Sequence, residues 1–184
     1  MKRDNTFIKK CIVESLVQLM KEKDFKDITI TEITKKAGVS RMSYYRNYYF
    51  KEDILNNYMN ELIEGYEKIR NIIIEKNKNC TYPLILHVLR FFDDNKNFVI
   101  ALEKSNLSNI IQNRLNVFIE KTYPFDTTES KYNSIIFSGA LYNMCKTWIL
   151  TGSKEDSNIL AEIFVERMFP EEKIDRNFKL EEMM

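Results

Sequence analysis

Apolar residues recur at every third or fourth position along most of the chain. Between residues 6 and 23, Ile8, Ile12, Leu16 and Leu19 share one face at this spacing, which is typical of an amphipathic α-helix. Hydrophobic spacing, capping residues and polar breaks together predict eight further helices, over residues 29–36, 41–48, 51–75, 81–93, 96–104, 107–122, 127–151 and 155–168. We therefore expect an all-α fold of about nine helices.

Chain breakers are scarce, and this supports the helical prediction. Among 184 residues there are 4 Gly and 3 Pro, roughly 4% against about 12% in average proteins, and sheets joined by tight hairpins need more glycine than this. Polar segments at 77–81, 94–96, 105–106, 123–126 and 151–153 separate the later helices, and the tail 171–184 is expected to fray. Gly65 and Gly139 interrupt helices; close approach of another backbone would explain Gly139, and nothing explains Gly65.

A short segment near the N-terminus carries turn and capping signals. Thr29 and Glu32 form a T-x-x-E capping box. Gly38 lies where a left-handed residue ends a helix, and Ser40 can cap the next one. Two short helices joined by a glycine-containing turn and preceded by a packing helix predict a helix-turn-helix.

Residues 28–55 read ITITEITKKAGVSRMSYYRNYYFKEDIL. This segment resembles the DNA-binding domain of TetR-family transcriptional regulators over residues 6–65, and the rest of the chain is similar in architecture only. The resemblance implies a DNA-binding domain at 6–65, with its helix-turn-helix at about 29–48, and a C-terminal regulatory and dimerisation domain at 66–184. Tyr48 stands where the family more often has Phe. Phe50 stands where it usually has a small polar cap, and we expect Phe50 to pack unusually against the first helix.

The second helix of the motif combines core and contact residues. Tyr44 and Tyr48 share a face with Val39 and are expected in the core, whereas residues at the start of a recognition helix meet base edges. Stacking of the aromatic run 44–50 on single-stranded nucleic acid is disfavoured, because helical spacing buries two of its rings. The resemblance implies contacts with double-stranded operator DNA at Thr31, Arg41, Met42, Ser43, Tyr45, Asn47 and Lys51.

Charge is unevenly distributed. The net charge is +1, but residues 1–60 carry 12 basic and 8 acidic side chains, and the remaining residues carry 16 and 19. A basic head permits binding to a polyanion. Solvated helix faces explain the same distribution equally well.

The C-terminal half offers a candidate effector pocket and a candidate dimer face. The resemblance implies a small-molecule pocket, which His87, Phe91, Phe98, Tyr142 and Trp148 could line. Taken one by one, the aromatic residues are better explained as members of the hydrophobic core. His87 is better explained by a hydrogen bond to a neighbouring carbonyl. The helix over 127–151 is apolar over an arc so wide that it needs partners on two sides. With helix 155–168 it forms the expected homodimer face, which includes Gly139, Ile159 and Ile163; an intramolecular core helix is the alternative.

The sequence lacks the residues that other classes of function require. Three widely spaced cysteines and a single histidine provide no disulfide framework, metal site or catalytic constellation, so we expect no cofactor and no enzyme. No signal peptide or membrane-spanning run is present, which predicts a cytoplasmic protein. We expect a ligand-responsive repressor that binds a palindromic operator as a homodimer; the alternative is a TetR-like co-activator or adaptor acting through a protein partner.

Overall fold

The computed structural model describes residues 4–76, 81–122, 126–172, 174, 178 and 180. Within these residues the chain forms nine α-helices and one short 3-10 helix, η1, and no strand, which confirms the predicted all-α fold. In chain order the elements are α1 (Asn5–Glu22), η1 (Phe25–Asp27), α2 (Ile30–Ala37), α3 (Arg41–Tyr45), α4 (Lys51–Lys76), α5 (Tyr82–Asp94), α6 (Lys96–Lys104), α7 (Asn109–Thr122), α8 (Thr128–Leu150) and α9 (Ser157–Met168).

The largest departure from the predicted helices is in α3, which ends at Tyr45 rather than near Tyr48. The side-chain amide of Asn47 donates to the Ser43 carbonyl (2.9 Å), while the backbone N–H of Asn47 donates to Tyr44, one residue short of the α-helical partner. An asparagine that binds the backbone in this way competes with helix continuation. Parts of the predicted breaks, at 77–80 and 123–125, lie outside the described residues.

The chain divides into two compact units. The first comprises residues up to Ile63 together with Ile100–Ile110, and the second comprises Glu64–Val99 and the residues from Ile111 onward. The predicted division after residue 65 and this division after Ile63 fall in the same helix, α4. Ala101 and Leu102, both 0% exposed, belong to the first unit.

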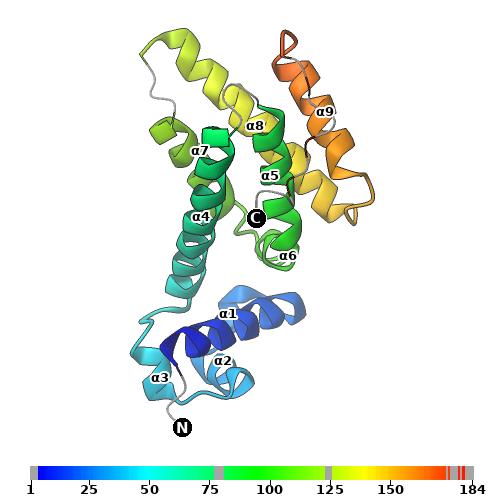
Figure 1. Ribbon diagram of the computed structural model, residues 1–184. Helices are drawn as coiled ribbons and strands as arrows, with labels where there is room; N and C mark the ends of the chain where they lie inside the picture. The colour runs from blue at the N-terminus through cyan, green and yellow to red at the C-terminus, as the bar shows by residue number, and fades with distance from the viewer. Residues whose placement is uncertain are drawn as a thin grey trace. The chain divides into compact units, whose positions relative to one another are not determined.

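In the first unit, α1 packs on α2, and α2 on α3 (Figure 1, blue to cyan). Ile12 and Leu16 of α1 are fully buried, as are Ile33 of α2 and Tyr44 of α3. The Lys36 ammonium lies 2.7 Å from a Glu22 carboxylate oxygen and joins the ends of α2 and α1. These contacts form the small core that holds the helix-turn-helix.

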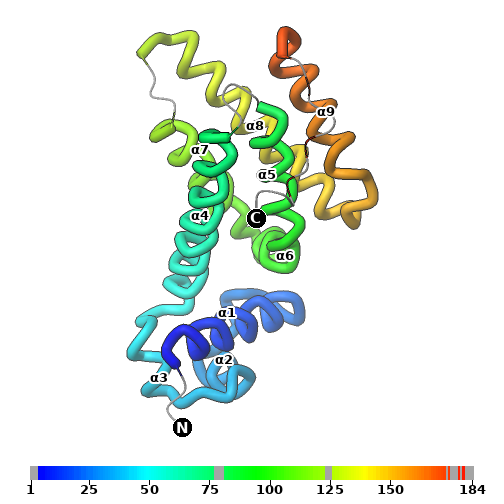
Figure 2. Tube along the Cα trace, in the orientation of Figure 1, coloured from blue at the N-terminus to red at the C-terminus, as the bar shows by residue number. Residues whose placement is uncertain are grey.

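In the second unit, α5 packs against both α8 and α9, whose connection is visible as a short turn in Figure 2. The indole N–H of Trp148 donates to the Glu155 carbonyl (3.0 Å) and fixes this turn. The ring of Phe137 on α8 meets that of Phe164 on α9 edge-on at 5.5 Å. None of the described helices has an apolar stretch long enough to span a bilayer.

Part of the C-terminal tail is held in place, contrary to the prediction that it frays. A carboxylate oxygen of Glu172 accepts hydrogen bonds from the backbone N–H groups of Thr81 and Tyr82. Both donors lie at the start of α5, where backbone N–H groups have no carbonyl of the preceding turn to bind and a negative charge is favourable. Leu180 is 1% exposed. Most other residues from 173 onward lie outside the described residues.

Candidate nucleic-acid interface

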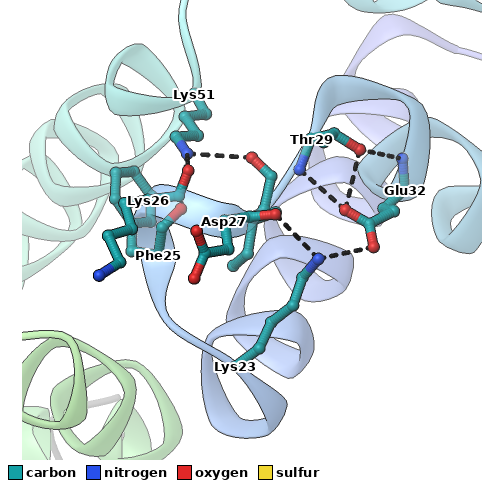
Figure 3. A network of polar contacts seen from close by, with 8 residues as sticks. Lys23, Phe25, Lys26, Asp27, Thr29, Glu32 and Lys51 are labelled. Atoms are coloured by element: carbon teal, nitrogen blue, oxygen red, sulfur yellow. Dashed lines mark hydrogen bonds and ion pairs between the residues drawn. The ribbon is translucent and has the colours of Figure 1, made fainter.

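The start of α2 is fixed by the predicted capping box. The Glu32 N–H donates to the Thr29 hydroxyl (3.3 Å), and the Thr29 N–H donates to a Glu32 carboxylate oxygen (2.9 Å). The Lys23 ammonium approaches the other oxygen at 2.6 Å (Figure 3). The hydrogen bond from Lys23, followed by those from the backbone and hydroxyl of Thr29, lowers the pKa of Glu32 from 4.5 to about 2. The carboxylate is therefore charged at the positive end of α2.

The turn between α2 and α3 has the predicted form. Gly38 is left-handed, with φ 61° and ψ 36°, and the N–H of Val39 donates to the Thr34 carbonyl (3.1 Å), as in the helix ending that glycine favours. The Ser40 hydroxyl accepts from the Ser43 N–H (3.0 Å) and caps α3. The first residue of α3 is therefore Arg41, as the sequence predicts.

The exposed side chains of α3 are those predicted to face DNA. Met42 is 79% exposed and Tyr45 49% exposed, and Arg41 is also exposed. The guanidinium of Arg41 donates to the Thr31 hydroxyl (2.8 Å), which links the first turns of α2 and α3. The predicted core residues Tyr44 and Tyr48 are 0% and 2% exposed, and burial raises the pKa of each to about 12.

Ser43 and Asn47 lie in the same segment but are half-buried. The hydroxyl of Ser43 lies 3.0 Å from that of Ser40. Asn47 donates its amide to the Ser43 carbonyl. Both side chains therefore have local hydrogen-bond partners that any DNA contact would have to share or replace.

The expected packing of Phe50 against the first helix is wrong, because Phe50 is 69% exposed. Phe50 has no side-chain oxygen to accept from the first N–H groups of α4, but Asp53 supplies the reciprocal half of a capping box. One carboxylate oxygen of Asp53 accepts from the N–H groups of Phe50 (2.8 Å) and Tyr49 (3.1 Å). An acidic residue three positions after the expected cap is the signal that could have found this arrangement.

Lys51, which is predicted to contact a DNA phosphate, has hydrogen-bond partners within its own chain. Its ammonium donates to the carbonyls of Phe25 (2.5 Å), Lys26 (2.9 Å) and Ile28 (2.9 Å) and lies 4.6 Å from the centre of the Phe25 ring. Figure 3 shows the ammonium reaching from α4 to the connection between α1 and α2. These backbone partners could not be read from the sequence.

No protein-family model and no curated protein matches the sequence, but solved structures match its fold. The regulator of fatty acid degradation FadR from Bacillus halodurans aligns with 89% of this chain and 99% of its own, with TM-score 0.61 and 18% identity. A TetR transcriptional regulator from Streptococcus agalactiae 2603V aligns with 90% of this chain and 96% of its own, with TM-score 0.58 and 18% identity. This chain has the fold of TetR-family regulators. A third TetR-fold neighbour, FadR from Bacillus subtilis in complex with stearoyl-CoA, covers 86% of this chain and 96% of its own, with TM-score 0.58 and 19% identity.

In the second unit of this TetR fold, an aromatic cluster surrounds a residue that the sequence did not single out. Tyr66 of α4 stacks on His87 of α5 with ring centres 4.5 Å apart and planes 2° from parallel. Phe91 and Phe118 meet the Tyr66 ring edge-on at 5.5 and 5.6 Å. The Nε2 atom of His87 lies 3.2 Å from the Tyr66 carbonyl, and since a carbonyl only accepts, Nε2 carries the hydrogen. Burial lowers the pKa of His87, against the opposing effects of this hydrogen bond and of Asp94.

The other predicted pocket residues are buried in the same unit. Phe98, Tyr142 and Trp148 are 3%, 3% and 6% exposed, whereas Phe91 is partly exposed. His87 and Phe91 both contact the ring of Tyr66. The pocket stays a prediction.

An uncharged stripe runs along the exposed face of α8 in this TetR fold. It combines Tyr132, Ile135 and Ile136, which are 51–58% exposed, with later residues at helical spacing, namely Gly139, Ala140, Asn143, Thr147 and Leu150. On α9, Ile159 and Ile163 are 56% and 50% exposed. A Cβ atom placed on Gly139 would meet nothing within 4 Å. The close approach expected at Gly139 is therefore not made by the described residues of its own chain.

Proposed function

We propose that this protein is a DNA-binding transcriptional regulator, a ligand-responsive repressor that binds a palindromic operator as a homodimer in the cytoplasm. The observation that carries the proposal is the construction of α3. It is capped at its first turn, anchored by buried Tyr44, and exposes Arg41, Met42 and Tyr45 together. A short helix built in this way is what enters a major groove in a helix-turn-helix.

The exposed groups match the chemistry of DNA. The forked donors of Arg41 suit the O6 and N7 acceptors of guanine, and the thioether chain of Met42 suits a thymine methyl group. Ser43 can donate or accept at a base edge, while Tyr45, Asn47 and Thr31 can reach phosphate oxygens. The hydroxyl of Thr31, which accepts from Arg41, keeps its own hydrogen for such an acceptor.

The test is a binding titration against DNA from upstream of the protein's own gene. We expect Arg41→Ala to weaken specific binding by about 1–3 kcal/mol, the value of a good base contact, and Tyr45→Phe to weaken it less. Arg114→Ala on α7 removes the same charge outside the first unit and is the matched control. Each lost phosphate contact should reduce the slope of log affinity against log salt by about 0.9.

Undiminished binding by both Arg41→Ala and Tyr45→Phe would contradict the assigned contacts. The adaptor alternative draws on the exposed rings of Tyr49 and Phe50, which are 77% and 69% exposed. A stable complex with a protein partner, together with no DNA binding at any salt concentration, would favour that alternative over the repressor.

The exposed apolar side chains of α8 and α9 support the dimer. Each helix exposes large apolar side chains at helical spacing, namely Tyr132, Ile135 and Ile136 on α8 and Ile159 and Ile163 on α9, and exposed apolar side chains of this kind mark a protein interface when they lie together. A palindromic operator also requires two recognition helices, about 34–36 Å apart, from a two-fold dimer. We assign the second copy of this chain as the occupant of this surface.

We further propose that the second unit binds the effector, close to the aromatic cluster of Tyr66, His87 and Phe91. Acyl-CoA thioesters are the first class to test, because the neighbour from Bacillus subtilis is in complex with stearoyl-CoA. Binding of the effector should favour a distance between the two DNA-binding domains of the dimer that no longer matches the spacing of successive major grooves. We expect stearoyl-CoA to reduce operator affinity by about 5- to 150-fold, the usual range of such coupling, and free CoA to have no such effect. Equal operator affinity with and without stearoyl-CoA would exclude it as the effector.

A further inference from the structure

The connection between α1 and α2 exposes a run of backbone carbonyls that no helix satisfies in full. Residues 25–27 form the single turn of η1, and Ile28 and Thr29 are extended, with ψ angles of 124° and 153°. Carbonyls at the end of so short a helix lack the partners that a continuing helix would supply. They need donors from elsewhere in the fold.

Two lysines supply these donors. The Lys23 ammonium donates to the Asp27 carbonyl (2.9 Å), and the Lys51 ammonium donates to those of Phe25, Lys26 and Ile28 at 2.5–2.9 Å. Four consecutive carbonyls, from residues 25 to 28, thus accept from a lysine ammonium. Lys23 follows directly after the end of α1 and Lys51 begins α4, and both reach this connection in Figure 3.

Lys51 uses its whole donor capacity in this arrangement. An ammonium group has three hydrogens, and three carbonyls lie within hydrogen-bond distance of Nζ. The face of the Phe25 ring, 4.6 Å away, adds a cation–π contact. No N–H of Lys51 is left for a phosphate oxygen while these bonds persist.

We propose that Lys51 is a positioning residue of the DNA interface rather than a phosphate contact. Its three hydrogen bonds to the carbonyls of residues 25, 26 and 28, which we call the clamp, hold the connection between α1 and α2 against the first turn of α4. This connection leads directly into Thr29, which caps α2, and α2 carries Thr31, the partner of Arg41. Loss of the clamp therefore misplaces the base-reading side chains without removing a charge from the phosphates. The inference rests on the proposed DNA-binding function.

The first experiment compares Lys51→Met and Lys51→Arg with the wild type in operator titrations over a range of salt concentrations. Measurements are made at a temperature where circular dichroism shows each variant fully folded. Met keeps the length of the side chain without its donors. Arg keeps the charge, but its planar guanidinium cannot converge on three carbonyls as one ammonium does. Lys36→Met, which removes a lysine of the same unit that pairs with Glu22 at 2.7 Å, is the control.

We expect both Lys51 variants to lose about tenfold in operator affinity, the size of one lost base contact, with an unchanged salt slope and unchanged affinity for non-specific DNA. A phosphate contact would behave differently. Lys51→Met would then lower the slope by about 0.9 and weaken specific and non-specific binding alike, and Lys51→Arg would bind as the wild type does. Either that pattern, or operator affinity unchanged in the folded Lys51→Met variant, overturns the proposal.

A second experiment needs no DNA binding, so that failure of the clamp can be told apart from failure of the proposed function. The full-length protein is acetylated with an amine-reactive ester, and labelling is followed by mass spectrometry. An ammonium held by three carbonyls should react much more slowly than that of Lys10, whose side chain is 75% exposed. Labelling of Lys51 as fast as Lys10 overturns the clamp. Slow labelling of Lys51 in a protein that binds no DNA would retain the clamp and reject its role at an operator.

Discussion

At the scale of single residues, the predicted base contact Arg41 is held in place by a neighbouring side chain. Arg41 is exposed, but its guanidinium is already oriented by the Thr31 hydroxyl at 2.8 Å. A preoriented side chain loses less conformational freedom when it binds a base. Thr31 is thus expected to support Arg41 as well as to reach a phosphate.

Glu32 leads to a prediction about pH. Its pKa of about 2 in the folded chain lies below the ordinary value of 4.5, so its ionised form stabilises the fold above pH 4.5, and this stabilisation is lost as the pH falls toward 2. We expect Glu32→Gln to lower the melting temperature at neutral pH, and the difference from wild type to close as the pH is lowered from 5 to 2. Thermal melts at several pH values measure this difference.

The control for Glu32 is Glu22→Gln. Glu22 pairs with Lys36 at 2.7 Å but caps no helix, and exposed pairs of this kind contribute little. An equal loss of melting temperature in the two variants, or a difference for Glu32→Gln that does not change with pH, would contradict the capping role of the carboxylate.

At the scale of the elements, hydrophobic spacing and caps predict most helix bounds within two residues. The bounds of α6 are those expected, and α2 begins after its Thr29 cap as predicted. These features depend on residues within one or two turns of each other. The end of α3 was missed because it depends on the rotamer of Asn47, whose amide binds the Ser43 carbonyl.

The start of α4 gives a prediction for one element. The Asp53 carboxylate accepts from the N–H groups of Tyr49 and Phe50 and so fixes the entry of the chain into α4. We expect Asp53→Ala to cost about 1 kcal/mol of unfolding free energy, the usual value of a lost cap, as measured by urea denaturation. Glu52→Ala removes an exposed acid of the same first turn and should cost less. Equal costs would assign the effect to charge at the helix end rather than to capping.

At the scale of the whole molecule, substitutions at the two helical glycines can distinguish an effect on the stability of one chain from an effect on dimerisation. Among the described residues, an added Cβ at Gly65 or Gly139 would meet no atom within 4 Å outside the backbone of its own helix. Alanine should therefore stabilise either helix by up to about 1 kcal/mol. If a second copy packs on the α8 stripe, only Gly139→Ala places a methyl group in the interface.

We expect Gly139→Ala to weaken the dimer and Gly65→Ala to leave it unchanged, as measured by sedimentation equilibrium over a range of concentrations. Ile163→Glu, which adds a charge to the exposed face of α9, should weaken it further. A dimer of wild-type affinity in both Gly139→Ala and Ile163→Glu would place the interface elsewhere.

The sequence by itself determined the helices, the helix-turn-helix and the division between buried and exposed tyrosines of α3. Each of these depends on spacing and capping among residues close in the chain. Only the tertiary structure decided that Lys51 binds carbonyls 23 to 26 positions earlier, that Phe50 is exposed and that Tyr66 stacks on His87. A lysine or an aromatic ring has the same local pattern whether it faces solvent, DNA or the backbone of a distant turn. Its partner is set by how the helices pack, and no short stretch of sequence encodes that.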